Sequence, residues 1–142
     1  MPKLPAADAP SPARSATMRA IRSRDTAPEL AVRAVLHALA PGYRLHRKDL
    51  PGKPDIAFGR RRLAVFVNGC FWHGHDCARG ARTPKTNADY WRARIARNKQ
   101  RDARSLAALA EMGWRCVTIW ECETRDTREM RKWLRKALRA AP

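Results

Sequence analysis

An unbroken apolar run leads into a cluster of metal-binding residues in the stretch Leu63-Ala-Val-Phe-Val-Asn-Gly-Cys-Phe-Trp-His-Gly-His-Asp-Cys77. The run from Leu63 to Val67 has no polar residue, which is typical of a strand that is buried on both faces of a sheet. Because both faces need a covering layer, the sequence predicts an α/β fold with a central mixed β-sheet flanked by helices. The cluster then follows the carboxyl end of this strand.

The cluster has the composition and spacing of a zinc site. Cys70, His75 and Cys77 are soft or borderline donors that are close enough in sequence to bind one ion. A fourth ligand must come from Cys116 or Cys122. Cys116 is expected in the middle of a strand, where a thiol is more often a small buried hydrophobe, so Cys122 is favoured. Four protein ligands leave no open position, which predicts a structural zinc.

His73 is left over from this ligand set. An imidazole that is held beside a fixed metal site can act as a base or an acid near neutral pH. Phe71 and Trp72 lie between the first ligand and His73, where a core would not readily accept both rings. We expect both rings to be presented outward.

Asp55 is a candidate metal ligand. It follows Pro54 and opens a hairpin whose second strand leads to His73, and many nucleases place a metal-binding carboxylate in this way. A turn residue after proline is the simpler reading of an isolated Pro-Asp pair. The acid-x-Lys that usually stands on the second strand is absent, because Phe66-Val67-Asn68 takes its place. Another group must replace that lysine.

Two further acids, Glu29 and Asp102, are candidates for the same site. Glu29 is most simply the capping acid of a helix that begins after Thr26, although it could also support a catalytic histidine or a metal-bound water. The residues alone leave both readings open. Asp102 lies on the same stripe of a long helix as Trp91 and Asn98, which argues that its side chain points inward.

Capping signals and periodicity predict the other elements. Thr26-Ala-Pro-Glu29 matches a capping box that opens a helix ending before Pro41. Asn87 can cap a long helix from Ala88 to Met112, with Gly113 after its end. The remaining expected elements are strands over 43–47, 55–58 and 114–121, and a last helix that begins after Asp126 or Thr127.

Residues 1–16, rich in proline and alanine, are expected to form a disordered tail, and residues 17–142 a single domain. The carboxyl half of the long helix, with Leu106 and Leu109, is expected in the core. The last helix is expected to direct five apolar residues to the core, namely Met130, Trp133, Leu134, Ala137 and Leu138.

The chain is strongly basic, with 30 Lys and Arg against 13 Asp and Glu and a formal charge of +17. This excess favours nucleic acid as the partner. No apolar run approaches the roughly 20 residues of a membrane-spanning helix, and the amino terminus has no apolar signal core. A cytoplasmic, nucleoid-associated protein is therefore expected, and its cysteines are expected to bind metal rather than form disulfides.

Several motifs occur together in a specific order. They are Met18-Arg-Ala-Ile, Arg24-Asp-Thr, Leu50-Pro-Gly-x-Pro-Asp55, Gly69-Cys-Phe-Trp-His73, the helix from Tyr90-Trp91 to Arg101-Asp102, and Trp120-Glu-Cys122. From about Met18 to Cys122 the chain resembles the bacterial very-short-patch repair (Vsr) DNA mismatch endonucleases. This resemblance implies a restriction-endonuclease-like fold with a structural zinc. It also implies Mg²⁺-dependent nicking of one DNA strand 5′ of the mismatched T in T:G mispairs, which arise by deamination of 5-methylcytosine.

The resemblance also implies roles for individual residues. Asp55 and the main-chain carbonyl of Val67 would bind Mg²⁺, His73 would activate water, and Glu29 and Asp102 would support the hydrated metal and the histidine. The zinc ligands would be Cys70, His75, Cys77 and Cys122. The DNA contacts would come from an aromatic wedge, a minor-groove segment and the long helix, namely Phe71, Trp72, Trp91, Met18, Arg94 and Asn98. Val67 stands where some members have Thr, and Asn68 and Gly74 where some have His.

Double-stranded DNA with a T:G mismatch is the partner that the resemblance implies. It also implies a functional link to a DNA cytosine-5 methyltransferase and to mismatch-repair proteins, and we expect the protein to act as a monomer. Two alternatives remain. One is a zinc-containing nuclease of the same fold with a different DNA substrate, and the other is a non-catalytic zinc-containing DNA-binding module, in which Asp55 and His73 would be idle.

Overall fold

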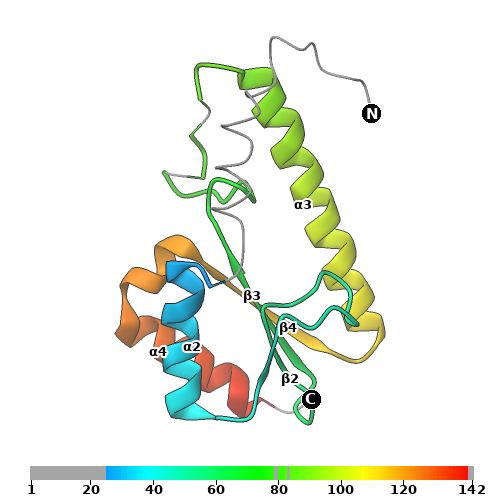
Figure 1. The fold of residues 1–142 in the computed structure, drawn as a ribbon, viewed down its shortest axis with the longest axis vertical. Coiled ribbons are helices and arrows are strands. Elements are labelled where there is room, and N and C mark those ends of the chain that lie inside the picture. Colours follow the sequence, from blue (N-terminus) through cyan, green and yellow to red (C-terminus); the bar gives the residue numbers. More distant parts are fainter. Residues whose placement is uncertain (1–24, 79, 83, 141–142) are drawn as a thin grey trace.

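The structure is a computed structural model that describes residues 25–78, 80–82 and 84–140 (Figure 1). The expected tail over 1–16 and the segment around Met18 lie outside these residues. The elements in chain order are α2 (Ala27–Leu39), β1 (Arg44–Leu45), β2 (Ile56–Phe58), β3 (Leu63–Asn68), α3 (Ala88–Glu111), β4 (Arg115–Trp120), the 3-10 helix η2 (Glu121–Arg125) and α4 (Thr127–Arg139).

The four strands form one mixed sheet in the order β1-β2-β3-β4. The β1–β2 and β2–β3 pairs are antiparallel, whereas β3 and β4 are parallel, with Leu63 opposite Arg115 and Asn68 opposite Trp120. The carboxyl ends of β3 and β4 therefore meet at the same edge of the sheet. This geometry brings the loop that follows Asn68 next to η2.

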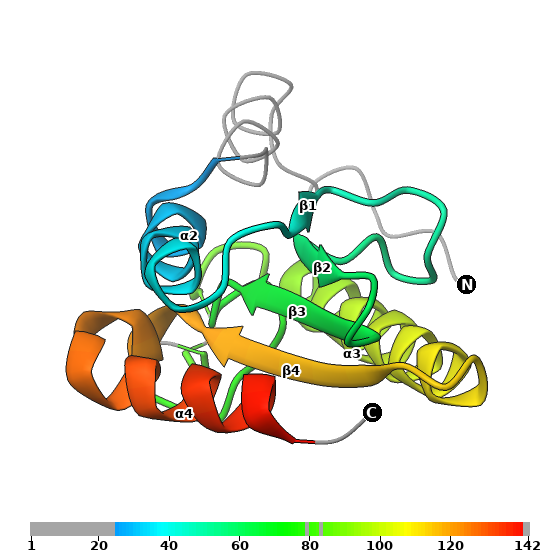
Figure 2. The same cartoon turned by 90° about the horizontal axis from the view of Figure 1, so that it is seen from below.

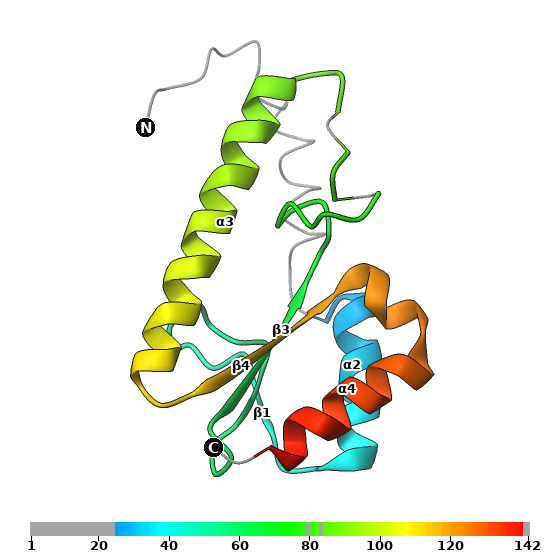
Figure 3. The same ribbon diagram turned by 180° about the vertical axis from the view of Figure 1, so that it is seen from behind.

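Helices cover both faces of the sheet, which confirms the predicted mixed α/β architecture. Helices α2 and α4 lie on one side of the sheet and α3 on the other (Figure 3). Leu63 and Val65 belong to the core cluster of α2 and α4, whereas Ala64 packs with Leu109 of α3. Strand β3 is thus buried on both faces, as its unbroken apolar run predicts.

The helix ends follow the predicted signals in all but one case. The Thr26 side chain accepts a hydrogen bond from the Glu29 amide, and Asp126 caps α4 by accepting from the Glu129 amide. Gly113 follows α3 with a φ of 85°, a left-handed conformation that favours glycine. Asn87 differs from the prediction, because its own backbone is left-handed and its side chain makes no capping hydrogen bond.

Two residues that were expected in the core are exposed instead. Leu106 is 36% exposed because α3 meets the sheet through Leu109, while Leu106 borders the cleft described below. Trp133 is 41% exposed, whereas its neighbour Leu134 is buried. Successive helical residues point about 100° apart, so a tryptophan next to a core leucine faces outward. No helix in the described part of the chain is long and apolar enough to cross a membrane.

Figure 2 shows α3 on the opposite side of the sheet from α4, with the arrowheads of β3 and β4 both pointing to the end of the sheet beside α2. The residues that the sequence singled out gather at this end.

Candidate active site and metal centre

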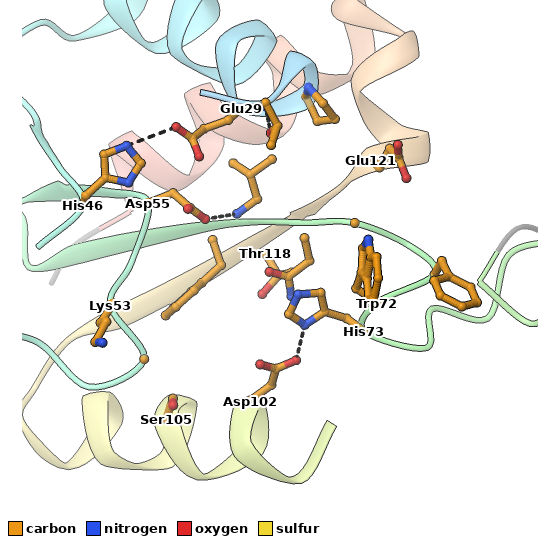
Figure 4. A pocket seen from close by; sticks show the side chains of 18 of the residues that line it. Glu29, His46, Lys53, Asp55, Trp72, His73, Asp102, Ser105, Thr118 and Glu121 are labelled. Carbon is orange, nitrogen blue, oxygen red and sulfur yellow. Dashed lines mark hydrogen bonds and ion pairs between the residues drawn. The ribbon is translucent and has the colours of Figure 1, made fainter. Parts of the chain in front are cut away.

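A cleft of about 810 Å³ lies where β3 ends, between the amino terminus of α2 and the middle of α3. Figure 4 shows its side chains converging from helices, strands and loops that are far apart in the sequence. Five carboxylates line it, namely Asp25, Glu29, Asp55, Asp102 and Glu121. Four predicted site residues, Glu29, Asp55, His73 and Asp102, are thus brought together, and Val67 lines the same cleft.

Asp55 is held against β3 at the floor of the cleft. Its Oδ2 accepts a hydrogen bond from the Val67 amide at 2.7 Å. Burial raises the pKa of Asp55 to about 6, with a smaller raising effect from the nearby Glu29 carboxylate and a lowering effect from the Val67 amide. Two carboxylates that share a buried site repel each other when both are ionised. A divalent cation would relieve this repulsion, so the donor set fits a metal such as Mg²⁺.

His73 and Asp102 form a hydrogen-bonded pair across the cleft. His73 Nδ1 lies 2.5 Å from Asp102 Oδ2, and the two side chains are 25% and 33% exposed. An ionised carboxylate can only accept, so Nδ1 carries the proton and donates. In the neutral imidazole Nε2 is then the basic nitrogen, which is the tautomer that a general base needs.

Asn98 and Asp102 lie one turn apart on α3 and hold consecutive residues of the loop. Asn98 Nδ2 donates to the Trp72 carbonyl at 2.8 Å, and Asp102 binds His73. The prediction that Asp102 points inward is confirmed. Asn98 is only 4% exposed and its side-chain oxygen accepts from Arg101. In this structure Asn98 therefore contacts protein rather than presenting its amide for a base edge.

Glu29 stands at the start of α2 and also reaches the cleft. Its amide donates to the side chain of the N-cap Thr26, and its carboxylate accepts from the amide of Asp25 at 3.2 Å and lines the cleft, so a role in supporting His73 or a metal-bound water stays a prediction. Arg33 donates to Glu29 and Asp25, and His46 Nε2 lies 3.3 Å from the Glu29 carboxylate. The Glu29 side chain is only 5% exposed. These contacts hold a buried carboxylate in place beside Asp55.

A second group of residues forms a candidate metal centre beside the cleft. One donor atom from each of Cys70, His75, Cys77 and Cys122 lies within 4.8 Å of the others. Three thiols and one imidazole at this spacing could bind zinc tetrahedrally. Cys116 instead packs in the core cluster with Leu109, so the preference for Cys122 agrees with the geometry. Burial raises the pKa of the Cys70 thiol to about 12, so a bound cation would be needed to ionise it near neutral pH.

The chain has close relatives among known proteins. Residues 8–79 match the family model for DNA mismatch endonuclease Vsr. Type II nicking enzyme V.XorIIP of Xanthomonas oryzae pv. oryzae is 51% identical over 121 residues, which cover 85% of this chain and 88% of that protein. DNA mismatch endonuclease Vsr of Escherichia coli is 38% identical over 117 residues, which cover 82% and 74%. Type II nicking enzyme V.NaeI of Lentzea aerocolonigenes is 42% identical over 118 residues, which cover 78% and 68%.

The chain belongs to the Vsr family. It is therefore a DNA endonuclease, as its motifs implied. The mixed sheet with flanking helices is consistent with the restriction-endonuclease-like fold expected of a Vsr endonuclease.

Aromatic rings form one wall of the cleft in this Vsr-family endonuclease. Phe71, Trp72 and Trp91 pack edge to face, with ring centroids 5.2 to 5.6 Å apart. Phe71 and Trp72 are half-buried and line the cleft, whereas Trp91 is only 2% exposed beneath them. The expectation of outward rings thus needs correction in part. Each ring shields the others from water, which lowers the exposure of all three.

Sequence reasoning missed several residues that border the Vsr site. His46 and Lys53 line the cleft, and a carboxylate oxygen of Glu121 accepts a hydrogen bond from the Cys70 amide at 3.4 Å. The ion pair between Arg33 and Glu29 could have been found, because the two residues are four apart on one helix. His46 and Lys53 had no such signal, because their neighbours in space are distant in sequence.

Proposed function

We propose that this Vsr-family endonuclease nicks one DNA strand 5′ of the mismatched T in a T:G mispair, in a reaction that depends on Mg²⁺. One observation carries the proposal: Asp55 and the His73–Asp102 pair share a single cleft, and the same loop that bears His73 bears Phe71 and Trp72. Cleavage and recognition of a distorted duplex are then coupled within one loop.

The proposed chemistry needs few groups. Phosphodiester hydrolysis requires that charge be neutralised and that a water be positioned and deprotonated. Asp55 and the Val67 carbonyl would hold Mg²⁺, which supplies the charge neutralisation. His73, oriented by Asp102 through Nδ1, takes the proton of the attacking water at Nε2. Glu29, fixed by Arg33 and His46, would support the water ligands of a bound metal.

The aromatic wall supports a role in mismatch recognition. Inserting rings into a duplex costs a few kcal/mol for each unstacked base step, and a mismatched step opens more easily. Phe71 and Trp72 face the cleft with Trp91 packed behind them, so the three rings form a supported wedge. A wedge of this kind makes mismatched DNA the better substrate.

Binding to the DNA backbone has a separate basis. A shallow hollow of about 340 Å³ on α3 is lined by six polar residues, namely Arg94, Arg97, Asn98, Gln100, Arg101 and Arg104. Arginines at this spacing face one side of the helix and suit phosphate oxygens. In the proposal Arg94 contacts DNA directly and Asn98 positions Trp72. Met18 would contact the minor groove, although it lies outside the described residues.

The remaining proposals follow from the T:G substrate. Such a protein works in the bacterial cytoplasm on the nucleoid, as a monomer, alongside a cytosine-5 methyltransferase and mismatch-repair proteins. Zn²⁺ bound by Cys70, His75, Cys77 and Cys122 is structural. A non-catalytic DNA-binding module is disfavoured, because the Asp55 and Glu29 carboxylates lie close together in the cleft and would destabilise the fold unless a cation bound between them.

The substrate is tested by nicking rates on duplexes with T:G, U:G, A:C or matched C:G pairs. We expect T:G to be nicked fastest, and Phe71→Ala/Trp72→Ala to lose most of this preference. The lost stacking is worth roughly 1 to 3 kcal/mol per base by analogy with aromatic stacking in other complexes. The measurement is the ratio of the T:G and C:G rates in wild type and variant.

Zinc content and thermal melting serve as folding controls for this double variant, and Trp133→Ala removes an exposed tryptophan remote from the cleft. An unchanged ratio in a folded protein would show that Phe71 and Trp72 do not read the mismatch. A wild type that nicks all duplexes equally would favour the alternative of a nuclease with a different DNA substrate.

The role of His73 as the general base is tested separately. His73→Ala should lower the single-turnover rate by about 10² to 10⁴-fold, the range typical of a lost general base. Asp102→Asn should also slow nicking, because the amide can donate to Nδ1 and so favour the wrong tautomer. Its loss should be smaller than that of His73→Ala, because the imidazole is still present. The double variant should be no slower than His73→Ala, since the two residues act as one unit. Fully additive losses would contradict the pairing seen in the structure.

A further inference from the structure

The cleft is acidic although the protein is strongly basic. Five carboxylates line it, and Lys53 is the single lysine or arginine among its described lining residues. Mg²⁺ would balance part of this negative charge, but a DNA phosphate entering the cleft adds more. A phosphodiester therefore needs a permanent cation here, and Lys53 is the side chain available.

The backbone that carries Lys53 is held tightly. The loop that contains it is buried at both ends, at Leu50 and Pro54. Lys53 itself has a φ of 51°, and its amide donates to the Leu50 carbonyl at 3.1 Å. A Cβ on Gly52 would come within 2.7 Å of Ser105 Cβ, so the loop presses directly against α3. A non-glycine residue rarely adopts this left-handed conformation unless its surroundings require it.

The Lys53 side chain is exposed, and no ion pair joins it to any residue between 25 and 140 that the structure describes. Figure 4 shows it at the end of the cleft opposite Trp72, across from Asp55 and beside Ser105 of α3. Lys48, which precedes Lys53 in the same connection between β1 and β2, is also exposed but does not line the cleft. An uncommitted ammonium group at the edge of an acidic cleft is free to bind an incoming anion.

We propose that Lys53 is a further catalytic residue, whose ammonium group binds a non-bridging oxygen of the scissile phosphate. It thereby takes the place of the lysine that is missing from β3, where Phe66-Val67-Asn68 stands instead of acid-x-Lys. The replacement comes from the loop before β2 rather than from β3, on the same side of the sheet as Asp102 and Ser105. This inference rests on the proposed hydrolysis in the cleft.

Binding at this position stabilises the transition state more than the ground state. As water attacks, negative charge builds on the non-bridging oxygens, and a fixed donor that is already in place gains strength with that charge. Lys53 should therefore affect the rate at saturating DNA more than it affects affinity. A cation that only bound the DNA backbone would do the reverse.

The test compares Lys53→Gln, Lys53→Arg and a matched control, Lys48→Gln, which removes the same charge from the same connection. All three replace one non-glycine residue by another, so any strain at position 53 is kept. We expect Lys53→Gln to slow single-turnover nicking at saturating enzyme by about 10²-fold, as when one oxyanion donor is lost. Lys53→Arg should recover much of the loss, Lys48→Gln should match wild type, and duplex affinity should change little in all three.

A methylphosphonate at the scissile position tests the contact itself, because it removes the charge from one chosen oxygen. With one of its two diastereomers the deficit of Lys53→Gln should shrink to about threefold or less, since enzyme and substrate then lack the same interaction. A deficit that persists with both diastereomers would overturn the contact. So would a Lys53→Gln variant that nicks like Lys48→Gln, or one that only weakens binding.

Failure of this inference can be told from failure of the proposed function. If Asp55→Asn is inactive while Lys53→Gln is normal, the cleft is the active site and only the role of Lys53 is wrong. If Asp55→Asn nicks normally, the proposed site itself is wrong. If wild type prefers a duplex other than T:G, the substrate is wrong, and the Lys53 comparison is made on the preferred duplex.

Discussion

Asp55→Asn is expected to abolish nicking while leaving duplex binding nearly unchanged. The substitution keeps the size of the side chain and an oxygen that can accept from the Val67 amide, but it removes the charge that would hold Mg²⁺. A catalytic metal supplies several kcal/mol of transition-state stabilisation, so the rate should fall on the order of 10³-fold or more. Binding should persist, because Asp55 makes no favourable contact with a phosphate.

The same substitution should stabilise the metal-free protein. Burial raises the pKa of Asp55 from 3.8 to about 6. The folded state therefore binds this proton more tightly than the unfolded chain does. Stability falls as the pH rises from about 4 to about 6 and stays reduced above that range. Asn carries no charge to bury, so at pH 8 the variant should gain roughly 1 to 3 kcal/mol, or several degrees in melting temperature.

Thermal melts at pH 5 and pH 8 check this expectation. The buffers should be freed of divalent ions with a resin rather than a soluble chelator, because a chelator would also remove zinc from the cysteine site. The advantage of Asp55→Asn should be largest at pH 8 and about half as large at pH 5, which lies midway between the pKa values of Asp55 in the unfolded and folded states, and added Mg²⁺ should stabilise wild type alone. A variant that still nicks, or that melts below wild type at pH 8, would contradict the assignment.

The local parts of the fold could be predicted because their causes are local. Continuous apolar residues from Leu63 to Val67 require cover on both faces, and the structure supplies α2 and α4 on one side and α3 on the other. Capping at Thr26 and Asp126 depends on residues within one turn. The choice of Cys122 over Cys116 followed from the expectation that Cys116 lies within a strand and Cys122 just past its end, and the structure places them in β4 and η2.

Burial and long-range partners could not be predicted in the same way. The helical periodicity of α3 places Trp91, Asn98 and Asp102 on one face of the helix. It does not predict that the Asn98 amide donates to the Trp72 carbonyl. That contact exists because the Gly69–Gly74 loop folds back onto α3. Lys53 reaches the cleft only because its loop packs against Ser105, a contact between residues far apart in sequence. No sequence pattern encodes the direction of its side chain.

Loss of the zinc ligands is expected to unfold the protein rather than only slow the nicking reaction. A metal bound by the four donors would join the loop after β3 to η2 after β4, and Cys70 is completely buried. Structural zinc contributes about 10 to 16 kcal/mol of apparent binding energy in small zinc domains, which is comparable to the whole stability of a domain. Cys70→Ser and Cys122→Ser should therefore be poorly soluble or unfolded, with less than one zinc per chain by elemental analysis.

Cys116→Ser is the matched control, because it makes the same change on β4 at a position that packs with Leu109 and Trp114. It should keep one zinc and melt only slightly lower. If Cys116→Ser loses zinc while Cys122→Ser keeps it, the fourth ligand is assigned wrongly. A metal held by these donors would also fix the loop that carries Phe71, Trp72 and His73, so zinc-depleted protein should lose mismatch preference and nicking together. Asp55→Asn, by contrast, should lose nicking alone and keep its zinc. This comparison distinguishes a structural role of the cysteine site from a catalytic role of the cleft.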